Sequence, residues 1–369
     1  MLVICLNAAF FCIGAASDEH INVKAYVLME GETKTVLESK NGDMPLNASY
    51  LTKLMSILLI AEHIDSGDLS LSEKLTASES VRNTKGAVIW LESGDSMTVE
   101  ELLKAVIIGN ANDALTVLCE RVSGGVEGFV MDMNGKAFDL GLSDTVFVSP
   151  YGYYSEKEHT TAQDIAVISS ELLKYEFLVP YFSTWRDFVK EGRTELVNEN
   201  KLTRSYGLHI GFKSCHSNES GYCTAECGRN DSGSVYIAVT LGAESEDTSY
   251  STVKQLLKKA FRNYKVIHTM FPEEMLKPLR VTDGTETAVE LSLSAQGKAA
   301  VSKADGGLVT KVVIPDYISA PVRKGQPVGY AAFYCGDTLV YDTQIVANSE
   351  VSTLSFDYIV KAMLLKVIK

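Results

Sequence analysis

The chain has 369 residues, a formal net charge of −13 and only 8 prolines. Hydrophobic residues make up 46% of it, which is enough for one large core and a smaller one and excludes a disordered chain. The acidic balance argues against nonspecific nucleic-acid binding, because that binding needs lysine and arginine to neutralise phosphates.

The first segment, residues 1–17, carries no charged side chain and ends in small residues around Ala15 and Ala16. This pattern is typical of the apolar and cleavage regions of a secretory signal peptide. We therefore expect an exported protein. A buried N-terminal helix is the alternative, because the basic residues that usually open such a signal are absent.

The middle of the chain has strand-like patterns at both ends and helical patterns between them. Residues 22–29 alternate like a strand, and residues 50–63 form an apolar helical run. Further helices are predicted at 99–109, 112–122, 126–140 and 161–174, and strands at 209–213, 221–227 and 234–242. The order predicts an α+β domain over residues 18–271.

From about residue 279 the pattern changes to short strands punctuated by glycine. Residues 288–293 alternate and residues 309–314 are β-branched. These features predict a small all-β domain over residues 279–350, with the boundary near Pro272 to Pro278.

The C-terminal segment, residues 352–369, places apolar side chains at helical spacing and adds three lysines. It is too short and too charged for a confident membrane span. We expect an amphipathic helix that lies in the membrane interface as an anchor. The alternative is a helix docked on its own domain.

The cysteines give no clear metal pattern. Cys5 and Cys12 fall within the predicted signal peptide. Five others would remain after export: Cys119, Cys215, Cys223, Cys227 and Cys335. An odd number leaves at least one thiol unpaired. A loose cluster in the sequence consists of Cys215, His216, Cys223 and Cys227. Its spacing matches no common zinc site, so we expect no metal and no cofactor.

Lys53 is the first candidate for chemistry, because it lies in the apolar run at 50–63. Burying an ammonium group is costly, and a buried lysine can have a lowered pKa and act as a base. The alternative is a lysine whose stem is buried while its charge reaches water.

Two further segments hold polar groups at the ends of predicted elements. Asn110 and Asn112 lie in a turn between two predicted helices, and Lys213 and Ser214 end a predicted strand before Cys215. A lysine beside a hydroxyl can bind a carboxylate. Taken alone, the first segment is an ordinary turn and the second a solvated strand end.

In this order and spacing, the three segments resemble the motifs of the serine D-alanyl-D-alanine carboxypeptidases, the low-molecular-mass penicillin-binding proteins. That family has Ser-x-x-Lys at a helix start, Ser-x-Asn between helices and Lys-Thr-Gly on an edge strand. Other stretches that match recurring parts of the family are Asn41-Gly42-Asp43, Ile107 to Ala114, Met133-Asn134-Gly135, Leu140-Gly141-Leu142, Thr160 to Asp164, Asn198 to Leu202, Glu219 to Cys223, Leu241-Gly242-Ala243 and Ala320 to Gly325.

The resemblance implies a penicillin-binding transpeptidase/β-lactamase-like domain, then a small all-β domain and a C-terminal amphipathic helix. It also implies a protein at the extracytoplasmic face of the cell membrane that acts on peptidoglycan stem peptides. In the family the first-motif serine attacks, the lysine accepts its proton, the second-motif serine helps to protonate the leaving D-alanine, and the third motif holds the terminal carboxylate.

The motifs of this chain depart from the family at four positions, one of which is a mild change. Aligned without gaps from Asn41 to Lys53, Tyr50 stands where the nucleophilic serine is expected. Asn110 replaces the second-motif serine and Cys215 replaces the third-motif glycine. Lys53, Asn112 and Lys213 remain, and Ser214 is a tolerable replacement for threonine.

These departures leave several hypotheses open. Ser49, four residues before Lys53, is an alternative nucleophile, because positions i and i+4 share a helix face; Tyr50 itself is another. The protein is then a carboxypeptidase with impaired acyl-enzyme chemistry, or a pseudoenzyme that binds stem peptides or a partner protein. Either form would bind β-lactams weakly or not at all. A redox or metal protein that uses Cys215, Cys223 and Cys227 is the third hypothesis.

Overall fold

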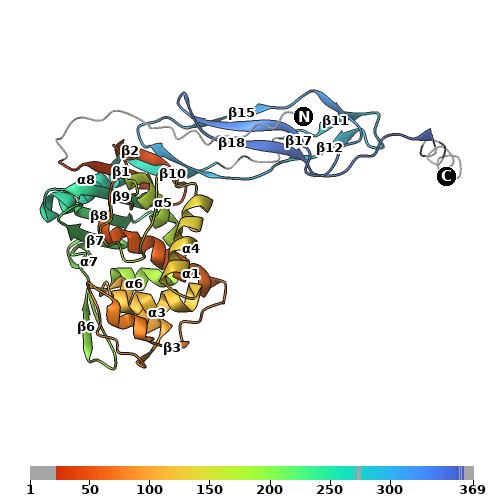
Figure 1. Cartoon of the computed structure of the whole chain (residues 1–369). Helices are drawn as coiled ribbons and strands as arrows, with labels where there is room; N and C mark the ends of the chain where they lie inside the picture. Colours follow the sequence, from red (N-terminus) through yellow and green to blue (C-terminus); the bar gives the residue numbers. More distant parts are fainter. Residues whose placement is uncertain (1–21, 270, 272–275, 357, 359, 361–369) are drawn as a thin grey trace. The chain divides into compact units, whose positions relative to one another are not determined.

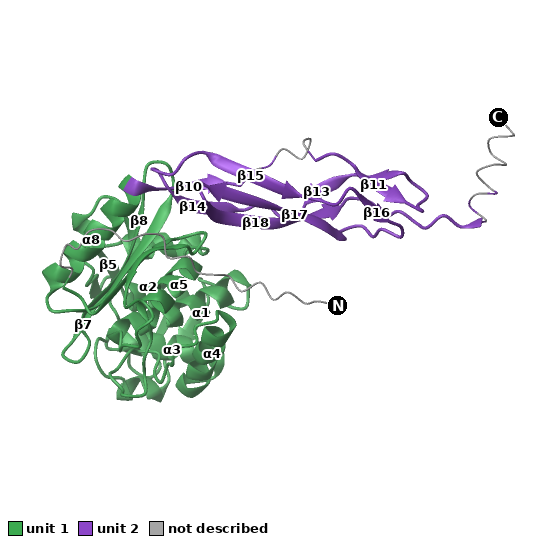
Figure 2. Ribbon diagram, turned by 90° about the horizontal axis from the view of Figure 1, so that it is seen from above, with its two compact units in different colours: residues 1–262 green, residues 263–369 purple. Residues whose placement is uncertain are grey.

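The computed structural model describes residues 22–269, 271, 276–356, 358 and 360. The chain divides into two compact units, residues 1–262 and residues 263–369 (Figure 2). The predicted signal peptide lies outside the described residues.

Unit 1 is built on a five-stranded antiparallel sheet with the order β2-β1-β9-β8-β7 (Figure 1). Its strands are β1 (Ala25–Glu30), β2 (Val36–Lys40), β7 (His209–Ser217), β8 (Gly221–Arg229) and β9 (Val235–Ala243). The first strand pairs with the last, with Val27 opposite Val239. The two edge strands of the sheet are therefore β2 and β7.

Strand alternation gives the sheet two differently covered faces. Val27, Ala225 and Val239 point into the main core, which also contains the apolar residues of α1 and α5. The other face meets α8 (Glu246–Asn263), where the Ser249 hydroxyl lies 2.7 Å from the Thr224 hydroxyl and 2.9 Å from that of Thr240. The sheet is therefore held between a helical bundle and a single long helix.

The helical bundle consists of α1 (Lys53–Asp65), α2 (Val99–Ile107), α3 (Asn112–Ser123), α4 (Val126–Asp139) and α5 (Ala162–Leu172). Helix α1 is buried over its first nine residues. Thr98 and Glu101 form a capping box that starts α2, and Gly124, with φ of 75°, ends α3 in the left-handed conformation. These local signals explain why the helix positions follow the sequence pattern closely.

Several elements of unit 1 were not anticipated from the sequence: β2, α8 and the short pieces between the main helices and strands. The short elements are the 3-10 helices η1 (Ser49–Thr52), η2 (Glu79–Asn83) and η3 (Glu176–Leu178), the strands β3 (Lys74–Thr76), β4 (Ser96–Thr98), β5 (Arg186–Val189) and β6 (Thr194–Val197), and the helices α6 (Val179–Ser183) and α7 (Leu202–Ser205).

Unit 2 is built from strands, as the sequence predicts. They are β10 (Tyr264–His268), β11 (Leu279–Thr282), β12 (Ala288–Val289), β13 (Leu291–Leu293), β14 (Lys298–Ser302), β15 (Leu308–Val313), β16 (Tyr317–Ser319), β17 (Pro327–Cys335) and β18 (Thr338–Ala347). The largest sheet has the order β13-β18-β17-β15 and packs on a core around Val322, Phe333 and Ile345. An α+β unit followed by a β-rich unit is confirmed.

The predicted C-terminal amphipathic helix falls mostly outside the described residues. Within the part of the chain that is described, no helix combines the length and the apolar character needed to cross a membrane.

Asp113, which is 1% exposed, ties the segment before β4 to the start of α3. Its carboxylate accepts from the backbone N–H of Ile89 at 3.1 Å and of Leu91 at 2.9 Å. Asp113→Ala leaves both donors unsatisfied, so we expect the free energy of unfolding to fall by about 2–4 kcal/mol. Urea unfolding followed by circular dichroism measures this.

A matched control is Glu79→Ala, which removes only an exposed ion pair to Arg82. It should change stability by less than about 0.5 kcal/mol. Equal effects of the two substitutions would contradict the role given to Asp113.

Candidate active site

The three sequence motifs lie close together. The first is at the start of α1, the second is in the turn after α2, and the third is on edge strand β7. Lys53 is fully buried, and its ammonium donates to the backbone oxygen of Asn110 at 2.6 Å and to the Asn110 side-chain oxygen at 2.9 Å. Asn110 has φ of 58°, in the left-handed region. The second motif therefore holds the lysine of the first.

The 3-10 helix η1 decides which residue lies beside Lys53. In such a helix residues i and i+3 eclipse each other, so Tyr50 stands on the same side as Lys53. The Lys53 ammonium lies 5.2 Å from the centroid of the Tyr50 ring. This cation–π contact is a further partner for the buried charge.

Ser49 lies one residue before Tyr50 and is buried. Its φ of 52° is a left-handed conformation that is uncommon outside glycine, and its backbone N–H donates to the Asn47 side chain at 3.0 Å. Among the described residues, no hydrogen bond joins the Ser49 hydroxyl to Lys53. The structure brings Tyr50, and not Ser49, over the lysine.

Lys213 projects from β7 toward the end of α2. Its ammonium donates to the backbone oxygens of Ile107 at 2.9 Å and Val106 at 3.4 Å, which are carbonyls at the end of a helix that favour a cation. Burial lowers the pKa of Lys213 to about 8, although the Glu199 carboxylate partly opposes this effect. Burial, assisted by the charge of Lys213, holds the pKa of Lys53 well below its usual range.

Glu199 is a site residue that sequence reasoning missed. Its carboxylate accepts from the Asn110 side-chain amide at 3.2 Å, and its negative charge favours the charged form of both lysines. The sequence marked the stretch from Asn198 to Leu202 only as a match to the family. Nothing local indicates that this stretch reaches a turn 89 residues earlier.

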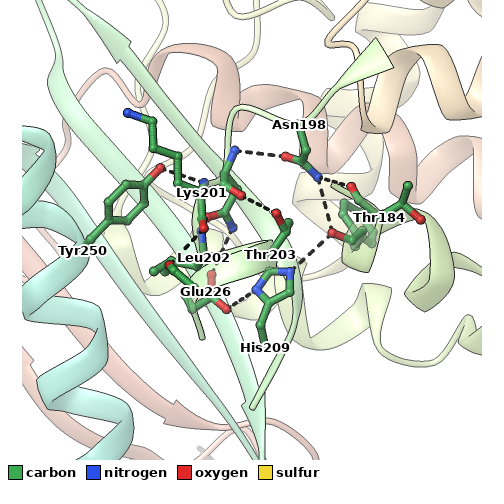
Figure 3. Close-up of polar contacts among 11 residues, drawn as sticks. Thr184, Asn198, Lys201, Leu202, Thr203, His209, Glu226 and Tyr250 are labelled. Atoms are coloured by element: carbon green, nitrogen blue, oxygen red, sulfur yellow. Dashed lines mark hydrogen bonds and ion pairs between the residues drawn. The ribbon is translucent and has the colours of Figure 1, made fainter. Parts of the chain in front are cut away.

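A polar network joins the stretch from Asn198 to Thr203 to His209, Glu226 and Tyr250 (Figure 3). Glu226 of β8 contacts His209 of β7 and accepts from the Asn200 amide at 3.0 Å. Tyr250 of α8 donates to the backbone oxygen of Glu199 at 3.2 Å. Burial opposes charge on His209, but the Glu226 contact prevails and raises the His209 pKa. The network fixes the Glu199 segment against the sheet.

Asn112 and Ser214 have hydrogen-bond partners other than Lys53. The Asn112 amide donates to the backbone oxygen of Lys85 at 2.7 Å and lies 3.2 Å from the Tyr153 hydroxyl. The Ser214 hydroxyl lies 3.1 Å from that of Thr224, on the sheet face covered by α8. Among the described residues, no hydrogen bond joins either side chain to Lys53.

Cys215 is buried between β7 and the start of α1. Its thiol donates to the backbone oxygen of Ala48 at 3.5 Å. The directly opposite residue on β8 is Cys223. Within the described residues, no group of three or more histidine, cysteine or acidic side chains is arranged to hold a metal ion.

Comparison with known proteins identifies this arrangement. The sequence profile of the D-alanyl-D-alanine carboxypeptidases matches residues 13–245, and that of the penicillin-binding protein 5 C-terminal domain matches residues 264–353. The chain belongs to the D-alanyl-D-alanine carboxypeptidase family. It is 31% identical to D-alanyl-D-alanine carboxypeptidase DacF of Bacillus subtilis over 338 residues, which are 90% of this chain and 87% of that protein.

Solved structures of the family share the fold. Penicillin-binding protein 5 from Haemophilus influenzae aligns with a TM-score of 0.84 at 22% identity, over 92% of this chain and 100% of that one. Penicillin-binding protein D2 from Listeria monocytogenes, in its cefotaxime-bound form, aligns with a TM-score of 0.60 at 25% identity, over 67% of this chain and 100% of that one. The family and fold inferred from the motifs are confirmed.

The lowered pKa of Lys213 makes stability depend on pH in a known direction. The folded pKa is about 8 and the unfolded value is about 10.4, so the unfolded chain binds more protons between these values. The wild-type protein should therefore gain stability as pH rises from about 8 to about 10, on the order of 1–3 kcal/mol.

Lys213→Met removes the titrating group and should lack this part of the gain. Urea unfolding of both proteins across the pH range measures the difference. Parallel pH profiles would contradict the burial of a charged Lys213.

Proposed function

We propose that this protein is a cell-envelope member of the carboxypeptidase family that binds peptidoglycan stem peptides at the extracytoplasmic face and is strongly impaired in acyl-enzyme formation. One observation carries the proposal. The Lys53 side chain, which in its neutral amine form would accept the proton of a nucleophile, is hydrogen-bonded to both oxygens of Asn110 and lies against the Tyr50 ring.

Tyr50 is a poor substitute for a motif serine. Acyl transfer needs a compact oxygen nucleophile close to its base and to the scissile carbonyl. The phenol oxygen lies at the far end of a ring whose carbon framework is what approaches Lys53. A misplacement of about 1 Å can cost on the order of 100-fold in rate, and a phenol in place of a serine shifts the oxygen farther than that.

Asn110 and Cys215 add two further obstacles. An amide can donate and accept hydrogen bonds but cannot readily relay a proton to a leaving amine. Cys215 is 6% exposed, and its thiol is hydrogen-bonded to the backbone oxygen of Ala48. Its side chain therefore fills space between β7 and the start of α1. Glycine at that position would leave room for a substrate backbone.

Peptide binding places weaker demands on geometry than catalysis does. Two of the three N–H donors of Lys213 are directed at Ile107 and Val106, which leaves one for a terminal carboxylate. Strand β7 lies at the edge of the sheet, so an extended peptide can pair with it as an added strand. We propose the same mode for stem peptides, and attachment to the membrane surface through residues 352–369.

An active enzyme that uses Ser49 is the second candidate, favoured by the left-handed backbone of Ser49 next to the first motif. Strained residues of this kind concentrate at functional sites. In this case Tyr50 is an inserted residue, and its deletion would place Ser49 three residues before Lys53.

Covalent labelling with a fluorescent penicillin separates the two candidates. The wild-type protein should form no adduct above the level of a Lys53→Ala variant. A variant with Tyr50→Ser, Asn110→Ser and Cys215→Gly restores the family motifs and should gain labelling by at least about 100-fold.

Two single changes serve as controls for the labelling. Tyr50→Phe removes the phenol oxygen and keeps the ring, and Ser49→Ala removes the alternative hydroxyl. Wild-type labelling that is lost in Ser49→Ala and kept in Tyr50→Phe would establish an active Ser49 enzyme and end the proposal of impaired acylation.

Binding of an acyl-D-Ala-D-Ala peptide tests the remaining half of the proposal. Isothermal titration calorimetry should detect binding by the wild-type protein, and Lys213→Met should weaken it by about 10-fold through loss of a charge-assisted contact. The exposed Lys85→Met is the matched control and should bind like the wild type. Equal loss in both variants, or no binding by the wild type, would count against stem peptides as the ligand.

A further inference from the structure

We propose that Cys215 and Cys223 are a covalent modification site: they form an intramolecular disulfide when the protein meets a low-molecular-mass disulfide oxidant. Cys215 belongs to the third motif, and Cys223 lies on the neighbouring strand β8. The proposal does not rest on the proposed function, because it concerns the chemistry of two thiols and not the binding of a peptide.

The two cysteines occupy directly opposite positions of the β7–β8 hairpin. Opposite residues of antiparallel strands project to the same face, with Cα atoms about 4.5–5.5 Å apart, which falls within the range of disulfide geometry. No backbone movement is therefore needed to bring the sulfur atoms together. The Cys215 thiol donates to the backbone oxygen of Ala48, and the Cys223 thiol donates to that of Ser220 at 3.7 Å.

The surroundings give the two thiols different roles. The Cys215 thiol donates to the Ala48 backbone oxygen at 3.5 Å, and burial raises its pKa well above the ordinary value. The neighbouring Cys215 thiol lowers the pKa of Cys223. Cys223 is thus the thiol that ionises first, and the thiolate is the attacking species in thiol–disulfide exchange.

Cys223 is 0% exposed and Cys215 is 6% exposed, so the oxidant reaches the pair while the β7–β8 hairpin opens or folds. The exchange then takes place in two steps. The Cys223 thiolate attacks one sulfur of an oxidant R–S–S–R, a Cys223–S–S–R bond forms, and RS⁻ leaves. The Cys215 thiol loses its proton and attacks the Cys223 sulfur, which releases the second RS⁻. Two protein thiols are oxidised to one disulfide, the oxidant is reduced to two thiols, and the two protons of the protein thiols end on the released R–SH.

The other described cysteines lack an equivalent partner. Cys227 lies on the same strand as Cys223, but the residue opposite it is Gly211. Cys119 belongs to α3 and Cys335 to unit 2. Cys227 is therefore a matched control: it is a buried cysteine of β8 whose strand partner has no side chain.

Disulfide formation also changes the candidate site. The Cys215 sulfur loses the hydrogen that it donates to Ala48, so one contact between β7 and the segment before α1 is lost. The redox state of the pair thus alters the fit of the edge strand against the first motif.

The test is a cysteine map of the full chain. The reduced protein is incubated with glutathione disulfide, and a parallel sample is refolded from urea in the same solution. Free thiols are then blocked with N-ethylmaleimide before digestion and mass spectrometry without reductant. We expect a peptide pair linked through Cys215 and Cys223, about 2 Da lighter than the two reduced peptides.

Variants decide whether the linkage is specific. Cys215→Ser and Cys223→Ser should each abolish the linked pair, and Cys227→Ser should retain it. Maleimide on both cysteines in both samples, linkage to another cysteine, or a glutathione adduct that persists on Cys223 would overturn the proposal. Penicillin labelling is a separate readout, so failure of this proposal is distinguishable from failure of the proposed function.

Discussion

The site depends on how the buried positive charge of Lys53 is satisfied. An ammonium group without water needs partners nearby, and the chain supplies both oxygens of Asn110 and the face of the Tyr50 ring. In our proposal, the contacts that make burial tolerable also engage the group that would act as the base. A serine at either position would leave the lysine with a partner that can exchange a proton; an aromatic ring and an amide stabilise the charge without offering that exchange.

A second lysine raises the electrostatic demand. The charge of Lys213 disfavours charge on Lys53, and the Glu199 carboxylate favours it. The backbone around Glu199 is held by the hydrogen bonds of Glu226 and Tyr250. The chain has the carboxypeptidase fold with these charged groups in place, and the alteration of its hydroxyl chemistry is our proposal. Membership of a family establishes the scaffold, and the site alone decides the activity.

The helices of unit 1 follow from period and capping signals in the sequence, and the motifs locate the site. Helix α8 was missed because its buried residues, such as Tyr250 and Leu257, are diluted by serine, threonine and lysine. The contact of Glu199 with Asn110 spans 89 residues, so local pattern carries no trace of it. The placement of Ser214 is different: it alternates with Lys213 and Cys215 along a strand, so strand period alone predicts that its side chain lies on the opposite face.

The most direct measurement is a crystal structure of the protein soaked with a penicillin. The account predicts the Tyr50 ring over the Lys53 ammonium, the Asn110 oxygens bonded to that ammonium, and no ester bond to the drug. An acyl group on the Ser49 or Tyr50 oxygen, with that oxygen in hydrogen-bonding contact with Lys53, would contradict it.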